Sequence, residues 1–314
     1  MTDVAIGVDV GGTKTLALAL GVDGAVLASS RAPSRASSVD ELVSALARQV
    51  TDVASRCRVD VSTVPLGLGL AGMVATDGLF AFSPHLPGAS GANVGERLAR
   101  VLERDDVVLD NDANLAALAE GRWGAARGEA NFVMVTLGTG IGGGIVADGR
   151  LLRGASGFAG EIGHMTLVAR GEPCPCGGRG CWERYVSGSA LARLAREASR
   201  EGRLDVAQFS LDPTGEEVAA AADRGDDGAR ALLEEMGWWL AAGLANLAAV
   251  LDTSCFVVGG GLSALSAHLL PSARRHLLEL TEGAAARPVV RVLDAALGPR
   301  ASAMGAALAA RMAT

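Results

Sequence analysis

The order of apolar runs and glycine turns is the same in two parts of the chain. In the first part, an apolar run at 4–10 precedes a Gly-Gly turn, a second run and the turn Asp23-Gly24. In the second part, a run at 132–137 precedes a Gly-Thr-Gly turn, a second run and the turn Asp148-Gly149. Asp-Gly between two apolar runs is typical of a β-hairpin. We therefore predict an internal duplication in which each copy begins with three consecutive strands, the third of them over 25–29 in the first copy and 150–153 in the second.

Helical patterns alternate with further strand-like runs after each of these starts. Apolar residues recur at helical spacing in the first part over 38–57, 94–103 and 111–124, and in the second over 226–251, 263–281 and 301–312. The intervening apolar runs lie at 65–70, 107–109, 255–258 and 289–293. Alternating strands and helices predict an α/β protein with two duplicated α/β domains.

A division near residue 120 follows from this pattern. We expect a smaller domain over 1–120 and a larger domain over 121–299, with the last helix at 300–314 returning to the first domain. A length of 314 residues agrees with about two domains.

Charge and hydropathy exclude several classes of protein. The chain has 28 Lys and Arg against 35 Asp and Glu, a net charge of −7, which provides no basic field for nucleic acid. The longest apolar stretch, 238–251, contains Asn246 and is shorter than the ~18 residues of a membrane span. The N-terminus has no positively charged lead typical of a secretory signal. We expect a cytoplasmic protein that acts on small molecules.

The first glycine turn carries groups suited to a phosphate. Asp9 ends the apolar run, and Gly11, Gly12, Thr13 and Lys14 follow it. Backbone N–H groups at a glycine pair, a hydroxyl and an ammonium can bind phosphate, and a carboxylate can bind Mg²⁺. A hairpin turn with a solvated lysine is the alternative, but Lys14 is the only lysine in the chain. The order differs from a Walker A loop, because Thr13 separates glycine from lysine and a strand follows.

Two later turns are also rich in glycine. The residues from Gly138 through Thr139, Gly140 and Gly142 match the spacing of a dinucleotide fingerprint, which must open a helix. Because a strand-like run follows here, we expect a second phosphate-binding hairpin instead. A third turn lies between a strand and a helix, where it either approaches a ligand or simply starts the helix; its residues are Gly259, Gly260 and Gly261.

The cysteines provide the most specific pattern. Three of the five lie within eight residues between glycines, with a histidine ten residues upstream; with that histidine the set is His164, Cys174, Cys176 and Cys181. This donor set suits a tetrahedral structural Zn²⁺ site. Unconnected reduced cysteines or a redox disulfide are the alternatives. Cys57 and Cys255 lie singly in apolar runs and are expected in the core.

Acidic residues mark a further candidate site. Four polar residues lie between Asp110 and Asn114, at a predicted helix start. One of them could simply cap the helix. A carboxylate there is also held ionised by the helix dipole and suits a general base. Glu161 and Glu183 flank the cysteine-rich segment, where each is either positioned by the metal or merely exposed.

Together these segments resemble the ROK family of sugar kinases, especially its ATP-dependent glucokinases from high-GC Gram-positive bacteria. The resemblance covers 4–312 and rests on the segments 9–15, 111–114, 137–144, 160–164, 174–183 and 257–261. It implies the actin-like ATPase (ribonuclease H-like) fold, with a cleft between two domains. It also implies transfer of the ATP γ-phosphate to the 6-hydroxyl of glucose, with Mg²⁺ at the phosphates and a structural Zn²⁺.

The resemblance also implies roles for particular residues. Asp112 is implied as the catalytic base, residues 7–14 and 138–145 as phosphate-binding segments, and 259–261 as the adenosine turn. The implied sugar ligands are Gly72, His85, Asn111, Asp112, Glu161, His164 and Glu183. His164 would bind zinc through one ring nitrogen and sugar through the other. His85 stands where many members have asparagine, and the segment 72–77 lacks the usual Gly-x-Val-Asp spacing.

Other functions of this family remain as alternatives. A kinase for N-acetylglucosamine, N-acetylmannosamine, mannose or fructose would use the same fold, and a polyphosphate-dependent enzyme is less favoured. A sugar-sensing transcriptional regulator would need an N-terminal helix-turn-helix, whereas the first predicted strand begins at Val4. We expect a homo-oligomer, either a dimer or a tetramer.

Overall fold

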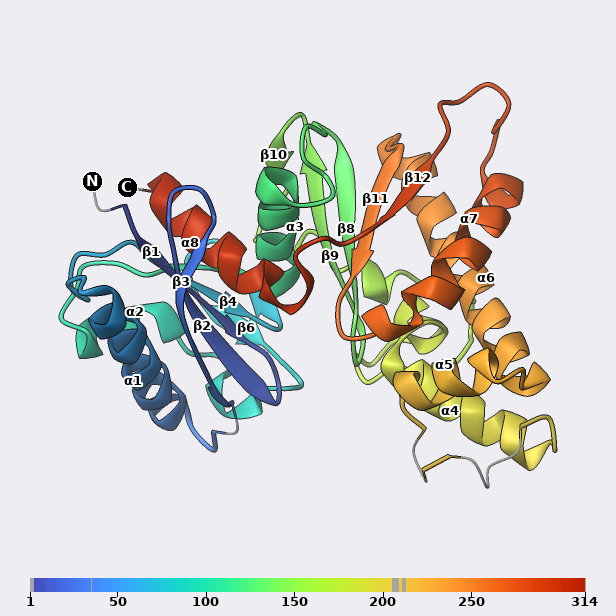
Figure 1. The fold of residues 1–314 in the computed structure, drawn as a ribbon, viewed down its shortest axis with the longest axis horizontal. Helices are drawn as coiled ribbons and strands as arrows, with labels where there is room; N and C mark the ends of the chain where they lie inside the picture. The colour runs from blue at the N-terminus through green and yellow to red at the C-terminus, as the bar shows by residue number, and fades with distance from the viewer. Residues whose placement is uncertain (1–2, 35, 205–208, 211–212, 314) are drawn as a thin grey trace. The chain divides into compact units, whose positions relative to one another are not determined.

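The computed structural model describes residues 3–34, 36–204, 209–210 and 213–313, which fall into two compact units (Figure 1). Unit 1 comprises Met1–Gly128, Gly144–Gly160 and Pro299–Thr314, and unit 2 comprises Glu129–Gly143 and Glu161–Gly298. This division differs from the predicted one in that residues 121–128 and 144–160 join unit 1. The reason is that helix α3 continues to Trp123 and that Gly144 lies against the backbone of the same helix.

Unit 1 is built on a sheet of strand order β3-β2-β1-β4-β7. The first three strands are antiparallel neighbours, and β4 and β7 run parallel to β1. The strands are β1 (Ala5–Val10), β2 (Lys14–Leu20), β3 (Val26–Pro33), β4 (Leu66–Leu70) and β7 (Val108–Asn111). A small hairpin follows β4, formed by β5 (Met73–Val74) and β6 (Phe80–Phe82).

Helices cover both faces of this sheet. Along β1, large apolar side chains point to one face, and smaller residues such as Gly7 point to the other. Ile6, Val8 and Val10 pack in the core with α1 (Val39–Cys57) and α2 (Val94–Val101). The opposite face receives α8 (Ala301–Ala313), which also packs against α3 (Asp112–Trp123). A Cβ on Gly7 would lie 1.9 Å from the carbonyl oxygen of Ala303, so glycine at this position lets the helix backbone approach the strand. The last helix therefore belongs to unit 1.

The second sheet has the strand order β10-β9-β8-β11-β12. Its strands are β8 (Phe132–Leu137), β9 (Ile141–Ala147), β10 (Arg150–Leu151), β11 (Cys255–Gly259) and β12 (Arg291–Asp294). As in the first sheet, consecutive hairpin strands are followed by two parallel strands. The main helices of unit 2 are α4 (Gly188–Arg200), α5 (Gly215–Asp223), α6 (Asp227–Leu251) and α7 (Ser266–Leu280). The matching strand orders confirm the predicted duplication.

Several predicted elements differ in their bounds from the structure: the run expected over 289–293 forms β12, Arg291–Asp294, and the helix expected over 94–103 ends at Val101. The helix expected over 263–281 begins with a separate 3-10 turn, Ser263–Leu265, before α7. The strand expected over 150–153 ends at Leu151, although the N–H of Leu152 still donates to the carbonyl of Ile145 at 2.8 Å; Arg153, two residues beyond the strand, pairs with Asp110. Among the residues described, none of the helices is both long and apolar enough to cross a membrane.

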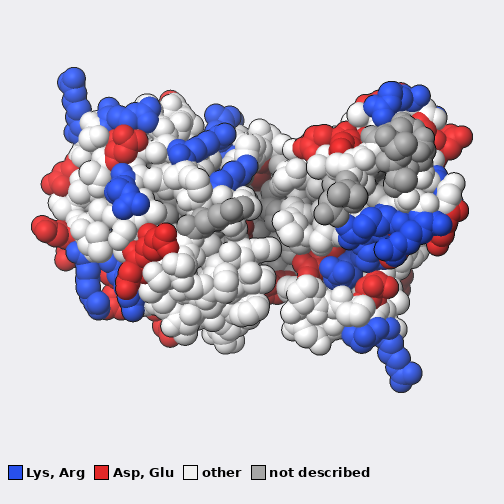
Figure 2. Space-filling view, turned by 90° about the horizontal axis from the view of Figure 1, so that it is seen from below, with Lys and Arg blue, Asp and Glu red and all other residues white. Residues whose placement is uncertain are grey.

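Charged side chains of both signs are interspersed on the face of each unit seen in Figure 2. No face of one sign spreads across either unit in that view.

Candidate active site

The turn between β1 and β2 places an acid and the single lysine together. The N–H of Gly11 donates to the carbonyl oxygen of Lys14 at 3.1 Å and closes the turn. Oδ1 of Asp9 accepts a hydrogen bond from Oγ of Ser302, on α8, at 2.8 Å. Burial raises the pKa of Asp9 to about 6, while the Ser302 hydrogen bond and the Lys14 charge lower it. A carboxylate and an ammonium at one glycine turn suit a magnesium-bound phosphate.

The segment around His85 lies against this turn. A Cβ on Gly12 would stand 2.8 Å from Cβ of His85, so glycine leaves the room that the imidazole needs. Oγ of Ser83 accepts the N–H groups of His85 and Leu86, each at 3.1 Å, and donates to the carbonyl of Ala71 at 2.7 Å. Ser83 therefore orients the histidine, a role that the sequence analysis missed. A hydroxyl that bonds backbone two residues on is typical of turn-forming serine, and Ser-Pro-His could have indicated it.

Two of the predicted sugar ligands are in direct contact in unit 1. Gly72 has φ of +147°, and a Cβ there would lie 2.5 Å from the carbonyl oxygen of Phe82, so only glycine fits. Its carbonyl oxygen accepts a hydrogen bond from Nδ2 of Asn111 at 3.0 Å. The structure thus joins the turn after β4 to the end of β7.

The boundary between β7 and α3 is capped by Asn111. Its Oδ1 accepts the N–H groups of Ala113 and Asn114 at 2.8 and 3.1 Å, so the helix-cap interpretation applies to this residue. Asp112 is the first residue of α3, is half-buried, and accepts the N–H of Ala113 at 2.9 Å through Oδ1. Its carboxylate therefore lies at the positive end of the helix dipole, which favours the ionised form.

The neighbouring acid has different surroundings. Asp110 is 6% exposed. Its Oδ1 accepts the N–H of Asn111 at 2.8 Å and Nδ2 of Asn114 at 2.9 Å, and its Oδ2 accepts Nε of Arg153 at 2.8 Å. Both oxygens of Asp110 are thus bonded to groups of unit 1.

The second glycine turn lies between β8 and β9 in unit 2, and a strand follows it, as predicted. Its carbonyl groups meet the start of α4: the Gly188 N–H donates to Gly138 at 2.8 Å, and Oγ of Ser189 donates to Thr139 at 2.8 Å. A Cβ on Gly140 would stand 2.3 Å from Oε2 of Glu183. The turn therefore lies beside a predicted sugar ligand.

The third glycine turn lies next to the second. Strands β11 and β8 are parallel, with Gly259 opposite Thr136, so both turns leave the same end of the sheet. Gly260 has φ of +99°, and a Cβ there would stand 2.5 Å from the carbonyl oxygen of Leu137. A side chain is excluded at that position. The turns after β8 and β11 therefore lie next to each other in unit 2, and Gly142 lies on β9, the strand that follows the first of these turns.

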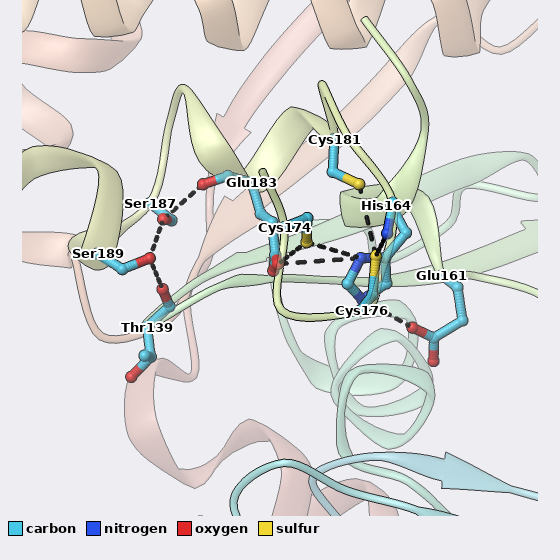
Figure 3. A network of polar contacts seen from close by, with 10 residues as sticks. Thr139, Glu161, His164, Cys174, Cys176, Cys181, Glu183, Ser187 and Ser189 are labelled. Carbon is cyan, nitrogen blue, oxygen red and sulfur yellow. Dashed lines mark hydrogen bonds and ion pairs between the residues drawn. The ribbon is translucent and has the colours of Figure 1, made fainter. Parts of the chain in front are cut away.

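The predicted zinc ligands converge in unit 2 (Figure 3). One potential ligand atom from each of the four residues lies within 4.8 Å of every other: His164, Cys174, Cys176 and Cys181. Nδ1 of the histidine is 3.9 Å from Sγ of Cys174, and the other two sulfurs are 3.7 Å apart. Ligands about 2.3 Å from a tetrahedral zinc are separated by roughly 3.8 Å, so the donor set and its spacing fit the ion.

The two ring nitrogens of His164 face different partners. Nδ1 faces the thiol cluster, whereas Nε2 lies 3.8 Å from Oε2 of Glu161. Oε1 of Glu183 lies 3.8 Å from Nδ1 and 3.2 Å from Sγ of Cys174. Burial raises the pKa of Glu161, His164 opposes this, and Glu183 adds to it. The two predicted acids thus lie on either side of the histidine, as Figure 3 shows.

A buried tryptophan anchors the end of this loop, which the sequence analysis did not anticipate. Trp182 is fully buried, and its Nε1 donates to the carbonyl of Trp239 on α6 at 2.8 Å. A Cβ on Gly243 would stand 2.1 Å from the indole ring. A large aromatic directly after the last cysteine could have indicated such an anchor. It fixes the 3-10 turn Trp182–Arg184, on which Glu183 lies.

The predicted residues therefore form two groups. Unit 1 holds Asp9, Gly11, Gly12, Thr13, Lys14, Gly72, His85, Asn111 and Asp112. Unit 2 holds Gly138, Thr139, Gly140, Gly142, Glu161, His164, Glu183, Gly259, Gly260, Gly261 and the three clustered cysteines. In each unit, a glycine turn suited to phosphate accompanies polar groups suited to hydroxyls.

Comparisons with known proteins agree with the resemblance. The family model described as ROK family matches residues 5–313. The chain is 37% identical to a glucokinase of Streptomyces coelicolor, covering 98% of this chain and 97% of that protein. It is 35% identical to an N-acetyl-D-glucosamine kinase of Escherichia coli, covering 87% and 89%.

A solved structure is also similar over its whole length. The crystal structure of a ROK family glucokinase from Streptomyces griseus, in complex with glucose and AMPPNP, superposes with a TM-score of 0.85 at 34% identity. The superposition covers 98% of this chain and 99% of that one. The predicted fold class is confirmed by this likeness.

Proposed function

Because this chain belongs to the ROK family, we propose that it is an ATP-dependent glucokinase, which transfers the γ-phosphate of ATP to the 6-hydroxyl of glucose. Similarity to glucokinases over nearly the full length of both chains supports the reaction class. The position of Asp112 at the start of α3 is the observation that carries the chemistry.

In this proposal Asp112 is the catalytic base. Its carboxylate accepts the proton of the sugar 6-hydroxyl while that oxygen forms a bond to the γ-phosphorus of ATP. The bond from the γ-phosphorus to the bridging oxygen breaks, and ADP leaves with the electron pair. The helix dipole and the Ala113 N–H keep the carboxylate ionised before the transfer.

The glycine turns would bind the nucleotide. Lys14 and the backbone around Gly11 and Gly12 are suited to the phosphates, and the turn from Gly138 is suited to them in unit 2. Asp9 would hold Mg²⁺, which when bound neutralises charge on the transferred phosphate. The turn from Gly259 would lie along the adenosine.

The sugar would be bound through its hydroxyl groups. We assign Gly72, His85, Asn111 and Asp112 to this role in unit 1. In unit 2 we assign Glu161, His164 and Glu183. Nδ1 of His164 would bind Zn²⁺ and Nε2 the sugar, so the ion would orient a sugar ligand without entering the reaction.

The cellular setting is part of the same proposal. We place the enzyme in the cytoplasm, as a homo-oligomer that feeds glycolysis with glucose 6-phosphate. The test is formation of glucose 6-phosphate from glucose and magnesium ATP, measured by a coupled dehydrogenase assay. Product formed without ATP, or none with any hexose, would contradict the proposal.

A further inference from the structure

We propose that Arg153 is a positioning residue for the Asp112 carboxylate, acting through its ion pair with Asp110. The pair joins the end of β7, two residues before α3 begins, to the segment that leads directly into Glu161. This inference rests on the proposed function for its kinetic consequences, but its structural consequence can be measured without turnover.

The first step of the argument is the position of Asp110 in a chain of hydrogen bonds. It accepts from Asn111 and Asn114 through Oδ1 and from Arg153 through Oδ2. Asn111 in turn caps α3 and donates to the carbonyl of Gly72. A change at Asp110 is therefore transmitted to the cap that fixes where Asp112 begins the helix.

The second step concerns the segment that carries the arginine. The N–H of Ala159 donates to the carbonyl of Arg153 at 3.0 Å, which closes a loop over 153–159. The carbonyl of Ser156 accepts the N–H of Thr76 at 3.2 Å, and a Cβ on Gly157 would lie 2.5 Å from the carbonyl oxygen of Val74. Besides the Arg153–Asp110 pair, two contacts thus attach this loop to the rest of unit 1 within eight residues of Glu161.

The third step is that the two partners differ in exposure. The Arg153 side chain is 46% exposed, whereas that of Asp110 is 7% exposed. A pair between two exposed side chains contributes little to stability. Removing the cation here leaves a buried carboxylate with two neutral donors, and such a group rearranges its neighbours or takes up water. The neighbours that would rearrange are Asn111 and Asn114, beside the base.

A matched control exists elsewhere in unit 1. Arg97 pairs with Asp40 at 2.7 Å, and its side chain is 45% exposed, but its partner is 80% exposed. Arg97→Met therefore removes an arginine of equal exposure from an ion pair that touches no predicted site residue.

Hydrogen exchange of the ligand-free protein tests the structural consequence. Arg153→Met is expected to accelerate exchange of the amides at 113–116 and 156–160, whereas Arg97→Met leaves both segments unchanged. Unchanged exchange in Arg153→Met would overturn the proposal whatever the enzyme phosphorylates. Because no substrate is needed, this result is independent of the proposed function.

Kinetics test whether Arg153 affects catalysis through Asp112. Arg153→Met is expected to lower kcat by about 10- to 100-fold, since small misplacement of a reacting group has effects of this size. The KM for ATP stays unchanged, and Arg153→Lys restores part of kcat because it keeps the charge. In an Asp112→Asn background the same substitution should cause no further loss of kcat. A full additional loss there would show that Arg153 acts independently of Asp112 and would overturn the proposal.

Discussion

Two carboxylates stand two residues apart at the start of α3, and only one of them is expected to react. Asp112→Asn keeps the shape of the side chain and its bond to the Ala113 N–H but removes the proton acceptor. We expect kcat to fall by ~10²–10⁴-fold with little change in Tm, because base catalysis contributes about this much. Steady-state kinetics and thermal melts measure both effects. Near-normal turnover in this variant together with an inactive Asp110→Asn would reverse the assignment of the two acids.

The raised pKa of Asp9 gives a second prediction at this scale. Its folded pKa of about 6 lies above the ordinary value of 3.8, so the folded chain holds this proton more tightly than the unfolded chain. The free energy of unfolding therefore falls as the pH rises from about 4 to about 6. At pH 7 the ionised carboxylate destabilises the fold, which Asp9→Asn would relieve.

We expect Asp9→Asn to raise the Tm of the ligand-free protein by a few degrees at pH 7 while its turnover is lost. The gain should shrink to about half at pH 5, where the buried acid is largely protonated. Thermal melts across this pH range, without nucleotide or Mg²⁺, provide the measurement. A Tm at pH 7 equal to or below that of the unaltered protein would contradict the prediction.

The positions of the glycine turns could be predicted from the sequence better than the hydrogen bonds and ion pairs of the polar side chains. Gly72 and Gly260 both have positive φ, and both lie so close to a carbonyl oxygen that a Cβ would clash with it. Only a residue without a side chain tolerates both conditions. The contact of Ser83 with Ala71 joins positions 12 residues apart, and that of Arg153 with Asp110 joins positions 43 residues apart. No local pattern indicates contacts over these separations. For the polar residues of 110–114, the pattern indicated that one could cap the helix but not which one, and the structure shows that Asn111 is the cap.

At the scale of elements, the zinc segment provides a prediction. We expect about one zinc ion per chain, bound by His164 and the three clustered cysteines. Cys176→Ala should lose the metal and loosen the turn that carries Glu183, so activity falls although no thiol touches the reacting atoms. Elemental analysis and kcat measure these effects, with Cys57→Ala, in α1, as the control. A fully active preparation without zinc would contradict this role.

Helices and strands with regular apolar spacing could be predicted from the sequence nearly to their ends. The helix expected over 38–57 is α1, Val39–Cys57, and Ser38 caps it through its side chain. The small hairpin of β5 and β6 was missed because strands of two and three residues show no periodicity. Strand β10 is shorter than expected, and Arg153, which was expected in it, instead pairs with Asp110, a tertiary contact that no local pattern indicates.

At the scale of the whole molecule, the duplication explains why the site residues fall into two groups. Each sheet begins with antiparallel hairpin strands and continues with two parallel strands, and a glycine turn follows the equivalent strands β1 and β8. The order of runs in the sequence predicted this repeat. It could not predict that residues 144–160 join unit 1, because packing against α3 decides that assignment.

Sequence identity alone separates the candidate sugars poorly, at 37% for a glucokinase and 35% for an N-acetyl-D-glucosamine kinase. The chemistry of the assigned ligands separates them better. Asn111, Asp112, Glu161, His164 and Glu183 offer many acceptors, and acceptors that a bound sugar covers discriminate strongly against a substrate that leaves them unpaired. An N-acetyl group needs an apolar or amide-binding surface, and we assign none of these side chains to that role.

We therefore expect kcat/KM to be highest for glucose, lower for mannose and much lower for N-acetylglucosamine at one concentration of magnesium ATP. His85 stands at the position where many members of the family have asparagine, and it can donate or accept according to its protonation. His85→Asn is thus the variant expected to shift the ratio between sugars while the Asp112 chemistry continues. A ratio that favours N-acetylglucosamine in the unaltered enzyme would overturn glucose as the substrate, whereas a continued requirement for Asp112 would retain the kinase mechanism.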